Sequence, residues 1–281
     1  MSRLSQSVLL HRFLCFAALT ISAAFALTIM SAFPVLAVEA KAVEEKTGKA
    51  MNVKPRARRV FKSVDEILNI YGETARAKLK ATFSAAGVSY PPKDMTWVCL
   101  KQEKVLLLFA KDKNGKQQQL FCYPIIGSSG ATGPKLKEGD MQVPEGFYRI
   151  PSFHPNVIAH MALDVNYPNE EDVAHAISEH RKKLGCDILI HGSRWSSGCL
   201  AMGNQPIEEM FVLAYDCGLK NIRLIFAPCN LASQKPNIDF KKHPAWLSPL
   251  YKRISTALNE LPIDISKVIP AETLSETQAR F

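Results

Sequence analysis

Hydrophobic positions along the chain follow two spacings, and the first of them is helical. After Ser63, apolar residues recur at intervals of three and four up to Gly87, at Val64, Ile67, Leu68, Tyr71, Ala75, Leu79 and Phe83. This spacing places them on one face of an α-helix. Ser63, followed three positions later by Glu66, forms a capping box, in which the Glu66 side chain reaches back to the start of the helix. The pattern predicts an amphipathic helix within residues 62–90 that packs on the rest of the chain.

The second spacing is that of short strands. Apolar runs bounded by turn residues predict strands at 97–100, 105–109, 119–126, 144–150, 159–165, 187–190 and 222–227. The Asn-Gly turn at 113–116 predicts a tight hairpin between the second and third of these runs. Further helices are predicted at 170–184, 207–217 and 247–261. Strands predominate and no βαβ rhythm repeats, so the expected fold is mainly β with peripheral helices, an α+β fold with an antiparallel or mixed sheet.

The first residues differ from the rest of the chain. Arg3, His11 and Arg12 precede an apolar run without charge over residues 13–38, and small residues around Ala37 resemble a cleavage site. The run is also long enough to cross a bilayer. Residues 1–37 are therefore either a cleaved signal peptide or a retained membrane anchor. Both readings predict an exported, periplasmic protein. The remaining chain is expected to divide into a basic linker (38–61), a helical segment (62–90), a main domain (91–229) and a helical extension (230–281).

Charge narrows the set of partners. The chain has 35 basic and 26 acidic residues, a formal net charge of +9, and basic residues gather in the predicted linker. A basic tether favours anionic surroundings such as phospholipid head groups or cell-wall polymer. Nucleic acid is not expected as a partner of an exported protein. A solvated linker without any partner is the simpler alternative.

Seven cysteines are present, and most of them indicate packing rather than chemistry. Cys15 lies in the predicted leader. The others, apart from Cys199, stand singly and without the Cys-x-x-Cys spacing of zinc sites: Cys99, Cys122, Cys186, Cys217 and Cys229. They are expected to be small buried hydrophobes, although a bridge between two of them is open in an oxidising compartment. No metal and no organic cofactor is predicted.

Cys199 is the exception because of its neighbours. The apolar run 187–190 ends in His191-Gly192, and Cys199 follows eight positions after His191, directly behind Ser196-Ser197-Gly198. A thiol is nucleophilic as the thiolate, and a nearby imidazole is the usual means of forming one at neutral pH. A loop that folds back would bring the two groups together. Cys199 is therefore the candidate nucleophile and His191 the candidate base.

Several blocks of sequence around this pair resemble a known family. The chain resembles the L,D-transpeptidase catalytic domain (YkuD type), and within it the shorter-motif YafK-like branch, over residues 97–228. The resemblance rests on Gly133-Pro134-Lys135, Glu138-Gly139-Asp140, Pro144-Glu145-Gly146-Phe147-Tyr148, Asn166-Tyr167-Pro168-Asn169, Ile190-His191-Gly192, Ser197-Gly198-Cys199 and Ile207-Glu208-Glu209.

The resemblance implies a β-sandwich-like catalytic domain that acts on peptidoglycan stem peptides. Cys199 would attack an amide between an L-centre and a D-centre and form a thioester, with His191 moving the proton. Backbone N–H groups at Ser197, Gly198 and Cys199 would form the oxyanion hole. Gly192, Ser196 and His160 complete the expected substrate-binding set. His160 matches a family histidine that could line the site or orient His191, or hold a purely structural place.

Two positions depart from the longer family motif. Ser197 stands where that motif has a second histidine, and Ala201 where it commonly has an arginine. The first change leaves one histidine, and the second removes an acceptor-side cation. Transpeptidation and hydrolysis therefore both remain open, the latter including release of a wall-linked protein. A non-catalytic wall-binding module is the alternative from a different class.

Overall fold

The computed structural model describes residues 59–269. The chain divides into residues 1–55 and 56–281, and the described range lies in the second unit. The predicted signal peptide or anchor, and the linker up to residue 58, lie outside the described residues. Within the described range, no helix is both long and apolar enough to cross a membrane.

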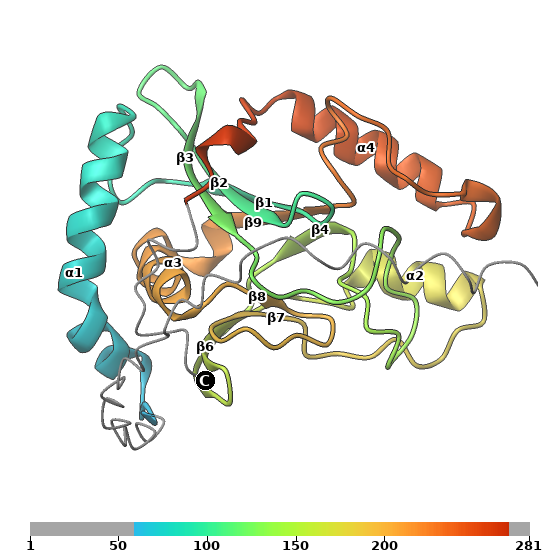
Figure 1. Cartoon of the computed structure of the whole chain (residues 1–281), viewed down its shortest axis with the longest axis horizontal. Helices are drawn as coiled ribbons and strands as arrows, with labels where there is room; N and C mark the ends of the chain where they lie inside the picture. The colour runs from blue at the N-terminus through green and yellow to red at the C-terminus, as the bar shows by residue number, and fades with distance from the viewer. Residues whose placement is uncertain (1–58, 270–281) are drawn as a thin grey trace, which may run out of the picture. The chain divides into compact units, whose positions relative to one another are not determined.

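The larger sheet has five strands in the order β3-β2-β1-β9-β4 (Figure 1). They are β1 (Met95–Leu100), β2 (Val105–Lys111), β3 (Gln117–Pro124), β4 (Gly146–Arg149) and β9 (Ile222–Ala227). β1 and β9 run parallel, and the other pairs are antiparallel. Alternate residues of β1 pack in two different hydrophobic cores. Trp97 and Cys99 belong to one core, and Val98 and Leu100 belong to the other. Burial on both faces explains why these strands read as continuous apolar runs.

The smaller sheet has four strands in the order β5-β6-β7-β8. They are β5 (Phe153–Val157), β6 (His160–Asp164), β7 (Leu189–His191) and β8 (Leu200–Ala201), and β7 and β8 run parallel. Met161, Ile190 and Leu200 of this sheet share one core with Trp97 and Leu106 of the larger sheet. The two sheets are therefore joined by a common hydrophobic core, which holds the small sheet in place.

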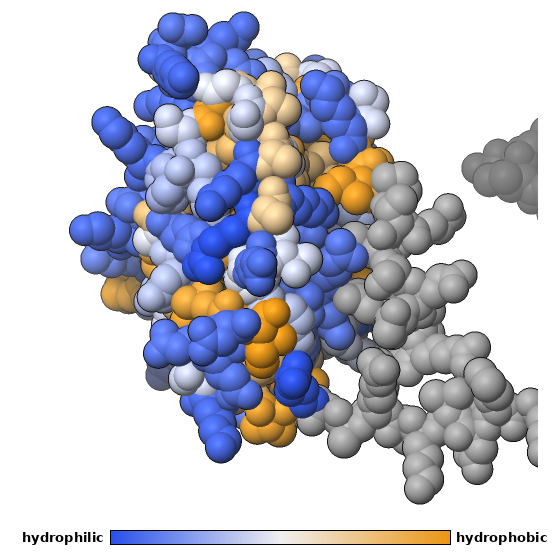
Figure 2. Space-filling model, turned by 90° about the vertical axis from the view of Figure 1, so that its left-hand side faces the viewer, coloured by the Kyte–Doolittle hydropathy of each residue, from blue (hydrophilic) through white to orange (hydrophobic). Residues whose placement is uncertain are grey.

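Within residues 59–269, four α-helices surround the sheets: α1 (Val64–Ala85), α2 (Glu170–Ser178), α3 (Asn204–Cys217) and α4 (Leu247–Asn259). Single turns of 3₁₀-helix follow α3 (Leu219–Asn221), precede α4 (Phe240–Lys242) and follow α4 (Ile265–Lys267). α3 packs in the core shared by the sheets, and α4 covers the other face of the larger sheet. α1 lies against α3 and presents a mostly hydrophilic surface outward (Figure 2).

Ion pairs add to the attachment of α1. The Arg76 guanidinium donates two hydrogen bonds to the Asp216 carboxylate of α3, at 2.8 and 2.7 Å. The Lys78 ammonium donates to Glu209 at 2.7 Å, and the Tyr123 hydroxyl donates to the other oxygen of Glu209 at 2.7 Å. Glu209 is buried, so these two donors replace the water that its carboxylate loses. The helix is thus joined to α3 by polar contacts as well as by its apolar face.

The predicted mixed α+β fold is confirmed, with local differences. The predicted helix at 170–184 ends at Ser178, because His180 adopts a left-handed conformation with φ of 56°. Half of the predicted capping box is present. The Ser63 hydroxyl accepts from the Glu66 N–H, but the Glu66 carboxylate accepts from Lys62 rather than from Ser63 itself. Strands β5 and β8 were not predicted. β8 has only two residues, too few to show a pattern.

Candidate active site

The pairing of β7 with β8 determines where the two reactive groups lie. His191 ends β7, and its register partner on the parallel strand β8 is Ala201. Cys199 lies outside β8, in the bend directly before Leu200. The strand pair therefore brings the end of β7, with His191, and the start of β8, with Cys199 before it, to one part of the small sheet. The seven intervening residues form the loop that returns the chain to that part of the sheet.

His191 is held in one tautomer. Its Nδ1 lies 2.5 Å from the carbonyl oxygen of Gly192, and a carbonyl can only accept, so we assign the proton to Nδ1. The Nε2 atom then has a free lone pair. Burial lowers the pKa of the His191 ring, and the bond to Gly192 opposes that shift only in part. The ring is therefore neutral at pH 7, with Nε2 able to accept a proton.

The Cys199 thiol is protonated in the resting structure. Burial raises the pKa of Cys199, and the nearby Asp187 carboxylate raises it further, whereas the Leu189 N–H and the Lys135 ammonium lower it. The thiol donates to the carbonyl oxygen of Asp187 at 3.5 Å. Within the described residues, no hydrogen bond joins Cys199 to His191. The resting site thus holds a neutral thiol and a neutral imidazole, and not a preformed ion pair.

The expected oxyanion donor at Gly198 is already engaged. The Gly198 N–H donates to the Ser129 hydroxyl at 2.7 Å, and that hydroxyl donates to the carbonyl oxygen of Met141 at 2.8 Å. Gly198 has a φ of +110°, and a Cβ at this position would lie 3.2 Å from the carbonyl oxygen of Gln142. The backbone there requires glycine. For its N–H to bind an oxyanion, the Ser129 hydroxyl must first release it.

The serines and the second glycine shape the loop. The Ser196 hydroxyl donates to the carbonyl oxygen of Cys199 at 2.6 Å and so closes the turn before Cys199. Ser197 is exposed and can meet a substrate. A Cβ on Gly192 would lie 2.7 Å from the carbonyl oxygen of Ala159 and from the side-chain oxygen of Asn204. Because Gly192 has no Cβ, its backbone can lie close to Ala159 and Asn204, and this contact fixes the chain directly after His191.

His160 lies beside this site without joining the pair. Its Nε2 is 2.8 Å from the Glu208 carboxylate of α3, and its ring packs edge-on against Phe61 and Tyr71. Its φ of 83° belongs to the tight turn between β5 and β6. Its Cβ atom lies near Gly192, but the described contacts of its ring are with α1, α3 and the segment before α1. This arrangement is that of a structural histidine.

A buried ion pair anchors the loop that follows Ser129 and supplies its acceptor, Met141. The Lys101 ammonium donates to the carbonyl oxygens of Gly133 and Val143, both at 2.8 Å, and to Glu145 at 2.9 Å. The same Glu145 carboxylate accepts from the Gly133 N–H at 2.8 Å and from the Tyr251 hydroxyl of α4 at 2.5 Å. Both ends of the loop over residues 133–143 are thus fixed to one ammonium group. We refer to these five residues as the Lys101 clamp.

Sequence patterns did not single out Ser129 or Lys101. Ser129 lies in a Gly-, Ser- and Pro-rich loop, and such loops rarely show which hydroxyl will meet the backbone of another segment. Lys101 at the end of an apolar strand looked like an ordinary turn residue. Its position directly after the buried run of β1 was the available indication. The six described cysteines are all free, and Cys186 is the exposed one besides the half-buried Cys199.

The segment that contains this geometry is similar to known proteins. The family model of the L,D-transpeptidase catalytic domain (YkuD) matches residues 96–216, the segment that contains both sheets' central strands and the site. Residues 96–216 form a domain of the L,D-transpeptidase family. This L,D-transpeptidase domain is 39% identical, over 114 residues, to YafK of Escherichia coli K12, itself a candidate L,D-transpeptidase, and equally to YafK of E. coli O157:H7. The match covers 40% of this chain and 43% of the length of each curated relative.

Solved structures resemble the L,D-transpeptidase domain at lower identity. The helical cell shape determining protein Pgp2 of Campylobacter jejuni is 20% identical, with a TM-score of 0.41 and coverage of 64% of this chain and 59% of that one. Bd1075 of Bdellovibrio bacteriovorus is 21% identical, with a TM-score of 0.36 and coverage of 50% of each chain.

Proposed function

We propose that this protein is a cysteine-dependent acyltransferase that acts on peptidoglycan stem peptides through a thioester acyl-enzyme. The observation that supports it is the parallel pairing of β7 with β8, which brings the chain at His191 and the chain at Cys199 to one part of the small sheet, inside a domain of the L,D-transpeptidase family. The free Nε2 of a neutral imidazole is the group that a protonated thiol needs in order to react. No metal or organic cofactor enters the proposed reaction.

The proposed first half-reaction begins with a turn of the thiol away from the Asp187 carbonyl oxygen. His191 Nε2 takes the thiol proton as Cys199 Sγ attacks the carbonyl carbon of the amide that joins an L-centre to a D-centre. The sulfur–carbon bond forms, the carbon–nitrogen bond breaks, and His191 gives its proton to the leaving amine. The Gly198 N–H, once released by Ser129, donates to the oxyanion that forms on the way.

The second half-reaction decides between transfer and hydrolysis. An acceptor amine or a water molecule gives a proton to His191 Nε2 as its nitrogen or oxygen bonds to the carbonyl carbon. The carbon–sulfur bond breaks, and His191 returns the proton to the Cys199 sulfur. The alanine at position 201 is the reason that hydrolysis is a second candidate reaction. It is buried, and its main chain pairs with Gly127, so position 201 offers no cation to an acceptor carboxylate. Hydrolysis would open wall cross-links or release a wall-linked protein.

Incubation of the purified protein with isolated wall material tests the proposal. Mass spectrometry of the muropeptides should show new cross-links if the protein transfers, and loss of links without replacement if it hydrolyses. The Cys199→Ala variant should give neither product. The Cys217→Ala variant removes a cysteine at the end of α3, outside the site, and should keep full activity. Full activity in Cys199→Ala would overturn the mechanism.

Thiol alkylation separates an enzyme from a non-catalytic wall-binding module. In the presence of a wall peptide, Cys199 of an enzyme should react faster than a free model thiol, because the thiol then faces His191. A His191→Gln variant should lose that acceleration. Equal reaction rates for Cys199 and a model thiol under both conditions would favour a binding module.

We further propose that the protein is exported. This proposal rests on the uncharged apolar run at 13–38 and on a wall substrate lying outside the cytoplasm. N-terminal sequencing of the protein recovered from cells would distinguish a signal peptide from an anchor, because cleavage near Ala37 would leave a new first residue beyond it. An intact N-terminus in a membrane fraction would indicate an anchor. A soluble protein with an intact N-terminus inside the cytoplasm would contradict export.

A further inference from the structure

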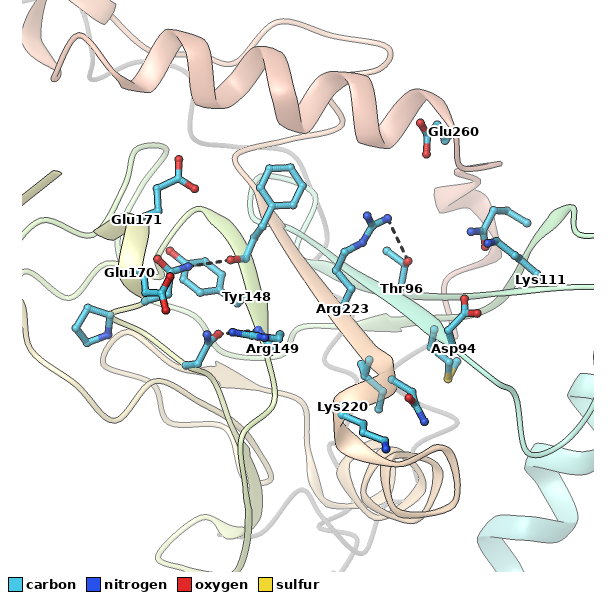
Figure 3. A pocket seen from close by; sticks show the side chains of 18 residues that line it. Asp94, Thr96, Lys111, Tyr148, Arg149, Glu170, Glu171, Lys220, Arg223 and Glu260 are labelled. Atoms are coloured by element: carbon cyan, nitrogen blue, oxygen red, sulfur yellow. Dashed lines mark hydrogen bonds between the residues drawn. The ribbon is translucent and has the colours of Figure 1, made fainter. Parts of the chain in front are cut away.

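A groove on the larger sheet is lined by charged residues that the proposed reaction does not use. It has a volume of about 990 Å³ and lies between β4, β9, the start of β1 and the start of α2 (Figure 3). None of its lining residues belongs to the segment 187–204 that contains Cys199 and His191. The groove is therefore a place separate from the candidate active site.

Two arginines stand opposite each other on the floor of this groove. Arg149 of β4 and Arg223 of β9 are register partners in an antiparallel pair, and both are exposed. The Cβ atoms of directly opposite residues lie about 4.5–5.5 Å apart, and like charges at such positions repel. A repulsive pair of this kind weakens the sheet unless an anion lies between the two guanidinium groups.

The protein itself supplies no such anion in the described range. No carboxylate among these residues forms an ion pair with Arg149, Arg223 or the neighbouring Lys220. The side-chain partner of Arg223 is the Thr96 hydroxyl, which the guanidinium meets at a long 3.4 Å. With Lys111, which also lines the groove and forms no ion pair with the described residues, four cations thus face one groove without a paired carboxylate. Paired guanidinium forks match the two oxygens of a carboxylate or a phosphate.

The walls of the groove narrow the choice of anion. Figure 3 shows Glu170 and Glu171 on one side of the arginines, and Asp94 and Glu260 on the other. Glu171 is neutralised by Arg253, at 2.6 Å, but Asp94, Glu170 and Glu260 form no ion pair with the described residues. These carboxylates repel a polyanion such as nucleic acid, an anionic membrane or a phosphate polymer. They attract a positive group that accompanies the bound carboxylate.

We propose that this groove binds an amphoteric peptide, with a carboxylate between Arg149 and Arg223 and an ammonium group near the wall carboxylates. The proposed site would bind a ligand without reacting with it. It would hold a peptide away from Cys199, and its existence does not depend on the activity proposed above.

The test is a titration of the purified full chain, followed by calorimetry or by chemical shifts, with three probes. The first is the dipeptide glutamyl-lysine, the second the same dipeptide acetylated on both amines, and the third inorganic phosphate. Glutamyl-lysine should bind saturably, and the double variant Arg149→Gln/Arg223→Gln should bind it at least tenfold more weakly. The acetylated dipeptide and phosphate should each bind more weakly than glutamyl-lysine.

Matched variants separate this site from non-specific charge and from the catalytic proposal. Lys241→Gln/Lys252→Gln removes the same net charge from exposed positions outside the groove and should leave the affinity unchanged. Cys199→Ala should also bind normally, so loss of catalysis and loss of this site are distinguishable. Without ligand, Arg223→Gln should not lower the thermal midpoint, because it relieves repulsion. Absence of saturable binding, equal affinity in the double arginine variant, or tighter binding of phosphate than of the dipeptide would each overturn the proposal.

Discussion

Removing the ammonium of the Lys101 clamp should destabilise the protein more than any exposed substitution near it. In Lys101→Met, the Glu145 carboxylate would stay buried without a cation, since its side chain is 0% exposed and that of Lys101 only 8%. The carbonyl oxygens of Gly133 and Val143 would also lose their donor. Breaking a buried pair by removing one partner costs about 3–5 kcal/mol. That is a large part of the roughly 5–15 kcal/mol by which a domain is stable.

Urea denaturation at pH 7 measures this loss, and two further variants interpret it. Lys104→Met removes an exposed lysine three positions away and should change stability by less than about 0.5 kcal/mol. Lys101→Met/Glu145→Gln leaves no buried charge and keeps an acceptor for the Gly133 N–H, so it should be more stable than Lys101→Met alone. A loss below about 1 kcal/mol in Lys101→Met, or a double variant less stable than the single one, would refute the reasoning.

Three shorter predictions concern Cys199 and its loop. Ser129→Ala should lower the free energy of unfolding by about 0.5–1.5 kcal/mol, because a hydrogen bond to the Gly198 N–H is lost, and should not slow acyl-enzyme formation. A tenfold slowing in a single-turnover assay would instead make Ser129 a donor to the reaction. Gly198→Ala should cost about 1–3 kcal/mol through strain at a φ of +110° and abolish turnover, whereas Gly139→Ala, at a φ of +73° with open space around it, should retain activity. The raised pKa of Cys199 and the lowered pKa of His191 leave both groups neutral at pH 7. The alkylation rate of Cys199 without substrate, measured by peptide mapping, should therefore rise about tenfold per pH unit from pH 6 to 8, because the thiolate fraction grows. A plateau of this rate across that range would indicate a preformed ion pair.

Much of the fold was readable from local pattern, because burial imposes a period on the sequence. The helix after Ser63 and the strand at 222–227 appear almost as predicted, since the first has one apolar face and the second is buried on both. The predictions failed where tertiary contacts decide. β8 forms because Gly127 and His191 lie beside it, and two residues contain no period of their own.

The sequence indicates the candidate pair, but it does not indicate the hydrogen bonds that the two side chains make. A cysteine and a histidine near a strand end indicate a chemistry by residue type alone, so Cys199 and His191 could be proposed from the sequence. Which hydrogen bonds they make could not. The Nδ1 contact with Gly192 and the thiol contact with Asp187 depend on how the loop closes, and the engagement of Gly198 depends on a serine 69 positions earlier.

The Lys101 clamp also does what a disulfide would do, without a redox reaction. A cross-link that fixes both ends of a segment reduces the number of conformations open to it, and small exported proteins commonly obtain this from paired cysteines. Here all six described cysteines are free, and one ammonium group ties Gly133 to Val143 instead. The segment beside Cys199 is therefore held equally well in oxidising and in reducing surroundings, so the Cys199 thiol need not share its compartment with a structural bridge that could exchange with it.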